Sequence, residues 1–326
     1  MVRLSTRCGW GAFCGVAVAV ALCHQPADIQ ARAGDAIVFT LNKDFIEKYR
    51  NLVTIEADMT VDVAGKVHAA KDDGDMHFSG RAKEVGLPFV AEIMNAKGQP
   101  GAVKAVRAAE GNAPIKVKGA WRLWCEHAGK VIQKQGSPLD TPFADANPAH
   151  VFEIHPVTAV EKRTIENSVG EITGFKYKDP NTSFTHYENV GCKITDNGDT
   201  VTIRTGMAGF NMPEFIMESV DTGDKKDKEN DAGGMKVADG RFLFAAVRDL
   251  DGELLVRKVR CAFIKDTEAE VAVRKMKAGQ RLHVVGIPRI SLTLIHWRIE
   301  HKNDPAEMDP LNWNLPYEII VVAVLN

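Results

Sequence analysis

Cysteine is scarce in this sequence, and its spacing argues against a small domain stabilised by disulfides or by a zinc ion. Three of the six cysteines lie within residues 1–33, and the other three are Cys125, Cys192 and Cys261. These three allow at most one disulfide, and the sequence contains no CxxC pair. A disulfide scaffold and a CxxC-type zinc site are therefore not expected. The fold has to depend on a hydrophobic core.

Several catalytic motifs are also missing. The sequence contains no GxSxG, no HExxH and no phosphate-binding GxxxxGK[ST]. This excludes the hydrolases, zinc peptidases and nucleotide-binding proteins that carry those motifs. It does not exclude a serine triad, because a triad is assembled in space and not in sequence.

A basic excess is absent as well. Without residues 1–33, Lys plus Arg falls from 41 to 38 and Asp plus Glu falls from 43 to 42, which leaves a net charge of −4. Proteins that bind nucleic acid neutralise phosphates with a surplus of cations. The charge balance therefore argues against a nucleic-acid partner.

The first 33 residues have the three parts of a signal peptide. Arg3 and Arg7 precede an apolar run at 10–23, and Ala31-Arg32-Ala33 provides a small-x-small cleavage site. The apolar run has 14 residues, whereas a membrane span needs roughly 20. We expect cleavage after Ala33, with 19–21 as an earlier candidate, and a periplasmic or secreted protein without a membrane span. Leu22 is not small, which argues against a lipid-anchored Cys23.

Alternation of apolar and polar residues predicts strands in the first half of the chain. In the segment 115–124, for example, Val117, Trp121 and Leu123 point to one side, and Lys118 and Arg122 point to the other. A short helix is expected at 42–53, and one or two helical turns at 100–111. The expected strands are 54–63, 75–81, 87–94, 115–124 and 151–158.

The second half repeats this order. Thr267 and Glu270 form a capping box that predicts a helix to about Lys277, ending at Gly279. The expected strands are 241–248, 254–264, 281–288 and 317–325, the last of them apolar on both faces and therefore buried on both sides.

Matching spacings predict an internal duplication. Gly74 and Gly119 are 45 residues apart, and Gly240 and Gly286 are 46 apart. From the second glycine of each pair, Glu153 follows after 34 residues and Glu318 after 32. The alternative is two unrelated β modules with loops of similar length.

Strand order and the position of the helix predict a mainly β protein with two tandem OB-like five-stranded barrels and short helices. The predicted organisation is a signal peptide (1–33), a first barrel domain (34–162), a linker (163–185) and a second barrel domain (186–326). The polar run at 221–239 should be a mobile loop in the second domain.

Four short motifs carry a family resemblance: Gly74-Asp75-Met76-His77, 90–93 (Val-Ala-Glu-Ile), 117–119 (Val-Lys-Gly) and 153–157 (Glu-Ile-His-Pro-Val). Together they resemble an OB-fold-like domain of uncharacterised exported bacterial proteins. The resemblance covers about 55–160, and the second half resembles it only in element order. It implies a fold and brings no catalytic residues.

A His/Glu cluster is the first candidate site. Glu153 and His155 share a strand face, and the barrel brings His77, Glu92 and Asp75 to the same polar side. Imidazoles and carboxylates bind zinc or another divalent ion, or act as general acid and base. The alternative is that these residues are solvated outward positions.

A basic and aromatic row is the second candidate. Lys118, Arg122 and Trp124 lie on one side of their strand, with Lys116, and OB barrels bind extended ligands on such surfaces. With His155, these residues form the predicted ligand surface. The alternative is an ordinary solvated strand.

The segment 289–300 is the third candidate, with His296 and Trp297 after an apolar stretch. It forms either a binding rim or an interdomain contact, or it is a packed connection.

These features predict an exported, non-catalytic binding protein for a small or extended ligand or a partner protein, without a cofactor. One alternative is a metal-dependent hydrolase that uses His77, Glu92, Glu153 and His155, with a divalent metal such as zinc. The other alternative is a structural or assembly protein of the cell envelope.

Overall fold

The computed structural model describes residues 36–129, 132–220, 234–304 and 309–325. The predicted signal peptide lies outside these residues, as does most of the predicted loop at 221–239. Among the described residues, no helix is both long enough and apolar enough to cross a membrane.

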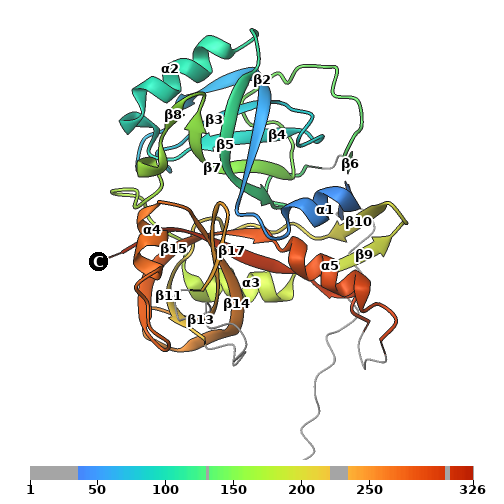
Figure 1. Ribbon diagram of the computed structural model, residues 1–326, viewed down its shortest axis with the longest axis vertical. Helices are drawn as coiled ribbons and strands as arrows, with labels where there is room; N and C mark the ends of the chain where they lie inside the picture. The colour runs from blue at the N-terminus through green and yellow to red at the C-terminus, as the bar shows by residue number, and fades with distance from the viewer. Residues whose placement is uncertain (1–35, 130–131, 221–233, 305–308, 326) are drawn as a thin grey trace, which may run out of the picture. The chain divides into compact units, whose positions relative to one another are not determined.

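Five strands of the first half close into a barrel (Figure 1). Their order is β4-β3-β2-β5-β7, and parallel pairing of β4 with β7 closes the sheet. The strands are β2 (Thr54–Val67), β3 (Met76–Arg81), β4 (Phe89–Ile93), β5 (Ile115–Leu123) and β7 (Phe152–Val160), with β8 (Arg163–Thr164) at the edge. A 3₁₀ turn (Ala96–Gly98) and helix α2 (Pro100–Ala109) join β4 to β5. This is the predicted OB-type order, with a longer helix than expected, because Ala102, Val103 and Val106 are buried.

The second half forms another closed five-stranded barrel with the same connectivity. Antiparallel pairing of β11 with β13 and parallel pairing of β14 with β17 correspond to the contacts of the first barrel. The strands are β11 (Glu214–Ser219), β13 (Gly240–Arg248), β14 (Leu254–Ile264), β15 (Arg281–Ile290) and β17 (Tyr317–Val324), with β12 (Met235–Val237) beside β13. Helix α4 (Glu268–Val273) is capped by Thr267 as predicted, but it ends four residues earlier than expected. Strand β17 is buried on both faces except at its last residue, as predicted.

A third sheet was not predicted. Its order is β16-β9-β10-β1-β6, and it combines segments from both halves of the chain. The strands are β1 (Ile37–Asn42), β6 (Gln133–Lys134), β9 (Gly191–Asp196), β10 (Thr200–Thr205) and β16 (Asn312–Asn314). Strands β6 and β16 come from the same connection in each barrel, the one between the fourth and fifth strands.

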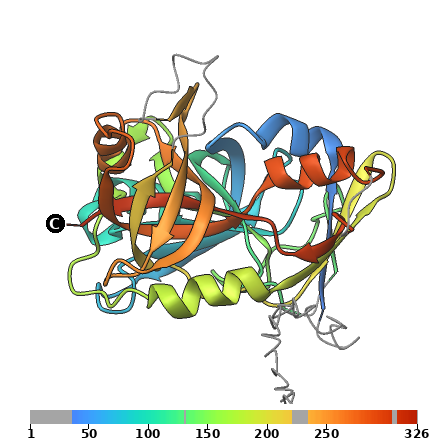
Figure 2. The same cartoon turned by 90° about the horizontal axis from the view of Figure 1, so that it is seen from below.

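Three helices and a 3₁₀ turn accompany this sheet and the connections. They are α1 (Lys43–Tyr49), α3 (Pro180–Asn189), α5 (Leu292–Glu300) and the 3₁₀ turn Glu166–Ser168. Helices α1 and α5 lie side by side (Figures 1 and 2). Helix α1 lies within the predicted range, whereas α3 begins inside the predicted linker.

One glycine of each barrel supports the predicted duplication. A Cβ atom on Gly119 would lie 2.7 Å from Ile154 Cγ2, and a Cβ atom on Gly286 would lie 2.3 Å from the equivalent Ile319 Cγ2. Both contacts are with the fifth strand of the barrel, so both positions require the same close approach of two strands.

An arginine–glutamate pair also recurs at the same place. Arg122 on β5 lies opposite Glu153 on β7, and Arg289 on β15 lies opposite Glu318 on β17. Each arginine follows its glycine by three residues. The two halves therefore share strand order, register and one buried ion pair.

The barrels contact each other through their outer faces. Arg122 Nε donates a hydrogen bond to the carbonyl oxygen of Pro288 at 3.0 Å. Arg289 donates to the carbonyl oxygens of Val53 at 3.1 Å and Trp121 at 2.9 Å. Residues of both barrels also share one buried apolar cluster, which includes Val53, Met94, Ala120, Phe242, Ala262, Val285, Ile287 and Ile320.

Candidate functional site

The predicted His/Glu cluster lies on the outer face of the first barrel but is buried. The exposed fraction is 0% for His155, 1% for Asp75, 2% for Glu153 and 5% for Glu92. The interpretation of these residues as solvated outward positions is therefore wrong. Only His77 keeps some exposure, with 15% of its side chain accessible.

Long connections cover this face. Ser79 on β3 donates a hydrogen bond to the carbonyl oxygen of Asp145 at 2.7 Å, and Arg81 donates to that of Leu139 at 2.9 Å. On the other side, Asn95 donates to the carbonyl oxygen of Ser168 at 2.9 Å. The covering segments are distant in sequence from the strands, so strand alternation alone predicts an exposed face here.

Three carboxylates surround the ring of His155. Nδ1 lies 3.1 Å from Glu92 Oε2 and 3.6 Å from Glu153 Oε2, and Nε2 lies 3.5 Å from Asp75 Oδ2. Neither ring nitrogen makes a hydrogen bond of acceptable geometry, and Asp75 Oδ1 also has no partner. A buried polar atom without a partner is costly, so it requires an explanation.

The charges in this cluster shift one another's pKa. Burial alone lowers the pKa of His155, but Glu92 and Asp75 outweigh it and raise the pKa to about 10. Burial raises the pKa of Asp75 to about 6 against the opposing effect of His155. Burial also favours a higher pKa for Glu92, yet His155 and His77 bring it down to about 2.

Glu153 belongs to the cluster, but both of its carboxylate oxygens already have partners. Its Oε2 forms an ion pair with Arg122, and its Oε1 lies 3.0 Å from His150 Nε2. Burial favours a higher pKa for Glu153, but Arg122 outweighs it and keeps the pKa well below the usual range. His150 Nδ1 donates to the carbonyl oxygen of Pro148 at 2.6 Å. The structure brings all four predicted metal ligands together, and both oxygens of Glu153 are engaged.

A second group of potential ligands adjoins the first. His68 Nδ1 lies 2.8 Å from Asp73 Oδ1, and the rings of His68 and His77 are 4.8 Å apart, edge to face. His77 Nε2 lies 3.4 Å from Glu92 Oε2 in the buried group. Glu92 outweighs the effect of burial and raises the pKa of His77 to about 9.

Two sets of three side chains have metal-ligand spacing among the described residues. In each set, one atom per residue lies within 4.8 Å of the others. We call Asp75, Glu92 and His155 the inner triad, and His68, Asp73 and His77 the outer triad. Asp75, Asp73 and His68 were not among the four predicted metal ligands. The acidic run 72–77 (Asp-Asp-Gly-Asp-Met-His) contains two of them and could have indicated the site.

The second barrel carries apolar side chains where the first barrel carries this cluster. The two arginine–glutamate pairs and the strand registers align the barrels residue by residue. His77, Glu92 and His155 correspond in this order to Phe242, Ala262 and Ile320, which are buried in the apolar cluster between the barrels. The fold therefore does not require the charged cluster.

The residues of the predicted ligand surface do not form one exposed row. Lys118 is half-buried, whereas Arg122, Trp124 and His155 are buried. Trp124 Nε1 donates to the carbonyl oxygen of Gly209 at 3.4 Å.

The segment 289–300 is mostly a packed helix. His296 on α5 lies 3.0 Å from Glu47 on α1 and 3.1 Å from Glu300. Trp297 is 49% exposed and stacks on His301. This agrees with a packed connection, since His296 joins two helices.

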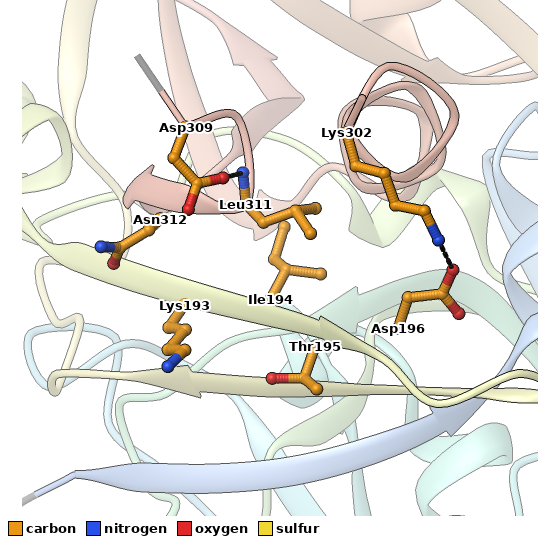
Figure 3. Close-up of a pocket in the computed structure, with 8 residues that line it drawn as sticks. All are labelled: Lys193, Ile194, Thr195, Asp196, Lys302, Asp309, Leu311 and Asn312. Carbon is orange, nitrogen blue, oxygen red and sulfur yellow. Dashed lines mark hydrogen bonds and ion pairs between the residues drawn. The ribbon is translucent and has the colours of Figure 1, made fainter. Parts of the chain in front are cut away.

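A surface cavity of about 300 Å³ lies beside β9 (Figure 3). Lys302 donates to Asp196 at 2.7 Å, and Asp309 accepts from the backbone N–H of Leu311 at 2.9 Å. These charged groups are engaged by one another or by backbone, and the cavity contains no histidine. The inner triad is thus the stronger candidate site.

No family model matches this chain, and no curated protein sequence is significantly similar to it.

Proposed function

We propose that this protein binds a divalent metal ion through the inner triad of Asp75, Glu92 and His155. The observation that supports this most directly is His155, which is fully buried among carboxylates while neither ring nitrogen makes a hydrogen bond. The ring is held by ion pairs alone, and a bound cation would coordinate one ring nitrogen, in place of its proton, together with the free oxygen of Asp75.

The charge of the triad suits a divalent ion. The two ionised carboxylates carry two negative charges. The imidazole of His155 is protonated in the metal-free protein, and it adds a nitrogen ligand without further charge once the metal has displaced that proton. Two oxygens and one nitrogen fit first-row divalent ions such as Mn²⁺ and Zn²⁺. The apolar counterparts in the second barrel support a functional origin for the cluster, because the second barrel adopts the same fold without it.

The burial of the inner triad supports binding over catalysis. Catalytic metal sites keep an open coordination position, whereas structural sites are closed. With 6% exposure or less, these three side chains leave no open approach for a substrate. Together with the signal-like residues 1–33, this leads us to propose an exported, non-catalytic metal-binding protein.

A metal-dependent hydrolase is the second candidate. The half-exposed outer triad favours it, because an ion held there is reachable from solvent. In that case an ester or amide is cleaved only by the metal-loaded protein.

Metal analysis of the purified protein tests the proposed function. We expect one tightly held ion per chain at the inner triad and its loss in Asp75→Asn and in His155→Asn. Asp239→Asn is a matched control, since Asp239 also has a buried unpartnered oxygen but is not part of either triad. If the protein remains metal-free after incubation with Zn²⁺ and Mn²⁺, the cluster is an ion network only and the proposal is wrong.

A further inference from the structure

We propose that the outer triad of His68, Asp73 and His77 is a second divalent-cation site, adjacent to the inner one. This inference deepens the proposed function and depends on it, because the outer ion is expected beside a loaded inner site. It adds a solvent-accessible ion to a buried one.

The ligand atoms of the outer triad are already close together. His68 Nδ1 and Asp73 Oδ1 are 2.8 Å apart, and the ring of His77 lies edge to face against that of His68 at 4.8 Å. Two imidazoles and one carboxylate are ligands that Zn²⁺, Mn²⁺ and related ions accept.

Backbone hydrogen bonds hold the loop that carries these ligands. The N–H of His68 donates to the carbonyl oxygen of Asp75 at 2.8 Å, and the N–H of Asp75 donates to Asp73 Oδ1 at 3.0 Å. Gly74 takes a left-handed conformation with φ of 72°, which makes the turn between the two aspartates. A held loop loses little conformational entropy when it binds an ion.

The two triads meet at one contact. His77 Nε2 of the outer triad lies 3.4 Å from Glu92 Oε2 of the inner triad. Since ligand bonds to such ions are about 2 Å long, ions bound to these two atoms lie within about 8 Å of each other. The loop itself also joins the two triads: Asp73 belongs to the outer triad and Asp75 to the inner triad, with Gly74 between them.

The two sites differ in access. The side chains of His68 and Asp73 are 29% and 27% exposed, whereas those of the inner triad are at most 6% exposed. The outer ion therefore keeps coordination positions for water or for an anionic ligand, and it exchanges faster than the inner one.

The chain contains a matched control for the outer triad. His283 Nε2 lies 2.8 Å from Glu214 Oε1 in the second barrel, with exposures of 31% and 27%. This pair has the same distance and nearly the same exposed fractions as His68 and Asp73, but it belongs to neither set with metal-ligand spacing.

Zn²⁺ stoichiometry of the full-length protein tests the proposal. We expect two ions in the wild type, one in His68→Ala and in Asp73→Asn, and two in His283→Ala. Asp75→Asn should lose the inner ion. Circular dichroism checks that each variant is folded.

Mn²⁺ provides a second measurement. Two Mn²⁺ ions within about 8 Å broaden each other's electron paramagnetic resonance spectrum, and the broadening should disappear in His68→Ala. One ion in the wild type and an unchanged count in His68→Ala would overturn the second site and leave the first. No ion in any form would overturn both proposals. Loss of both ions in His68→Ala would overturn the separate outer site, because both ions would then belong to one two-ion site.

Discussion

His155 of the first barrel and Ile320 of the second barrel occupy the same position on strands of the same topology. Each lies two residues after the glutamate that pairs with an arginine of the fourth strand. One is ionisable and surrounded by carboxylates, and the other is part of an apolar cluster. The second barrel thus shows the same face of the same fold without a candidate site.

This relationship predicts the effect of transferring the second barrel's residues to three positions of the first and removing the charge of Asp75. The variant with Asp75→Asn, His77→Phe, Glu92→Ala and His155→Ile should fold and bind no metal at either triad. Its metal-free form should be as stable as the wild type or more stable, because apolar replacements of buried charged networks are often neutral or stabilising. Thermal unfolding and metal analysis measure both effects. A variant that unfolds would show that the charged network supports the first barrel.

Asp75→Asn separates metal binding from stability of the metal-free protein. Burial raises the pKa of Asp75 to about 6 and so disfavours its ionised form. A neutral asparagine of similar shape should therefore leave the metal-free protein as stable as before.

The same variant should lose the stabilisation that metal provides. An ion at a hundred times its Kd adds about 2.7 kcal/mol to the wild type, which raises the Tm by roughly 5–10 °C. Differential scanning calorimetry with and without Zn²⁺ compares the two proteins. An equal rise in Asp75→Asn would contradict the assignment of Asp75 as a ligand.

Arg289→Ala should be one of the most destabilising substitutions in the second barrel. Arg289 is 0% exposed and donates to Glu318 Oε1 at 2.7 Å. Removing it leaves a buried carboxylate with less compensation, which costs about 3–5 kcal/mol.

Arg281→Ala on the same strand is the control. Arg281 is 51% exposed in its pair with Glu218, and exposed pairs contribute about 1 kcal/mol or less. Urea unfolding of both variants gives the two free energies. Similar losses in both would contradict the argument from burial.

Asp196→Asn should lower stability in a pH-dependent way. Hydrogen bonds from Lys302 and Lys43 lower the pKa of Asp196 to about 2, from 3.8. Because the pKa of Asp196 is lower in the folded than in the unfolded protein, its ionised form stabilises the fold. This stabilisation is complete above the unfolded-state pKa and is lost as the pH falls from near 3.8 towards 2.

The Tm difference between wild type and Asp196→Asn should therefore be largest near pH 7 and shrink below about pH 4. Both proteins are compared by thermal unfolding at several pH values. A difference that is constant with pH would mean that the side chain contributes through its shape and not through its charge.

The amino-acid sequence by itself determined most of the barrel strands. Alternation such as Val117, Trp121 and Leu123 against polar neighbours specifies which side of a strand enters a barrel core, because successive side chains point to opposite faces. It also determined β17, whose residues are apolar on both faces, and the equivalence of Gly119 with Gly286.

Only the tertiary structure decided the environment of the other face. The alternation places Arg122 and His155 on the outer face of the barrel, which is where they lie. They are nevertheless buried, because connections distant in sequence and the second barrel cover that face. The third sheet was likewise missed, because β6 and β16 are two and three residues long and pair with strands far away in the chain. Strand alternation is a local property, whereas the covering of a face and the pairing of short strands depend on contacts between distant segments.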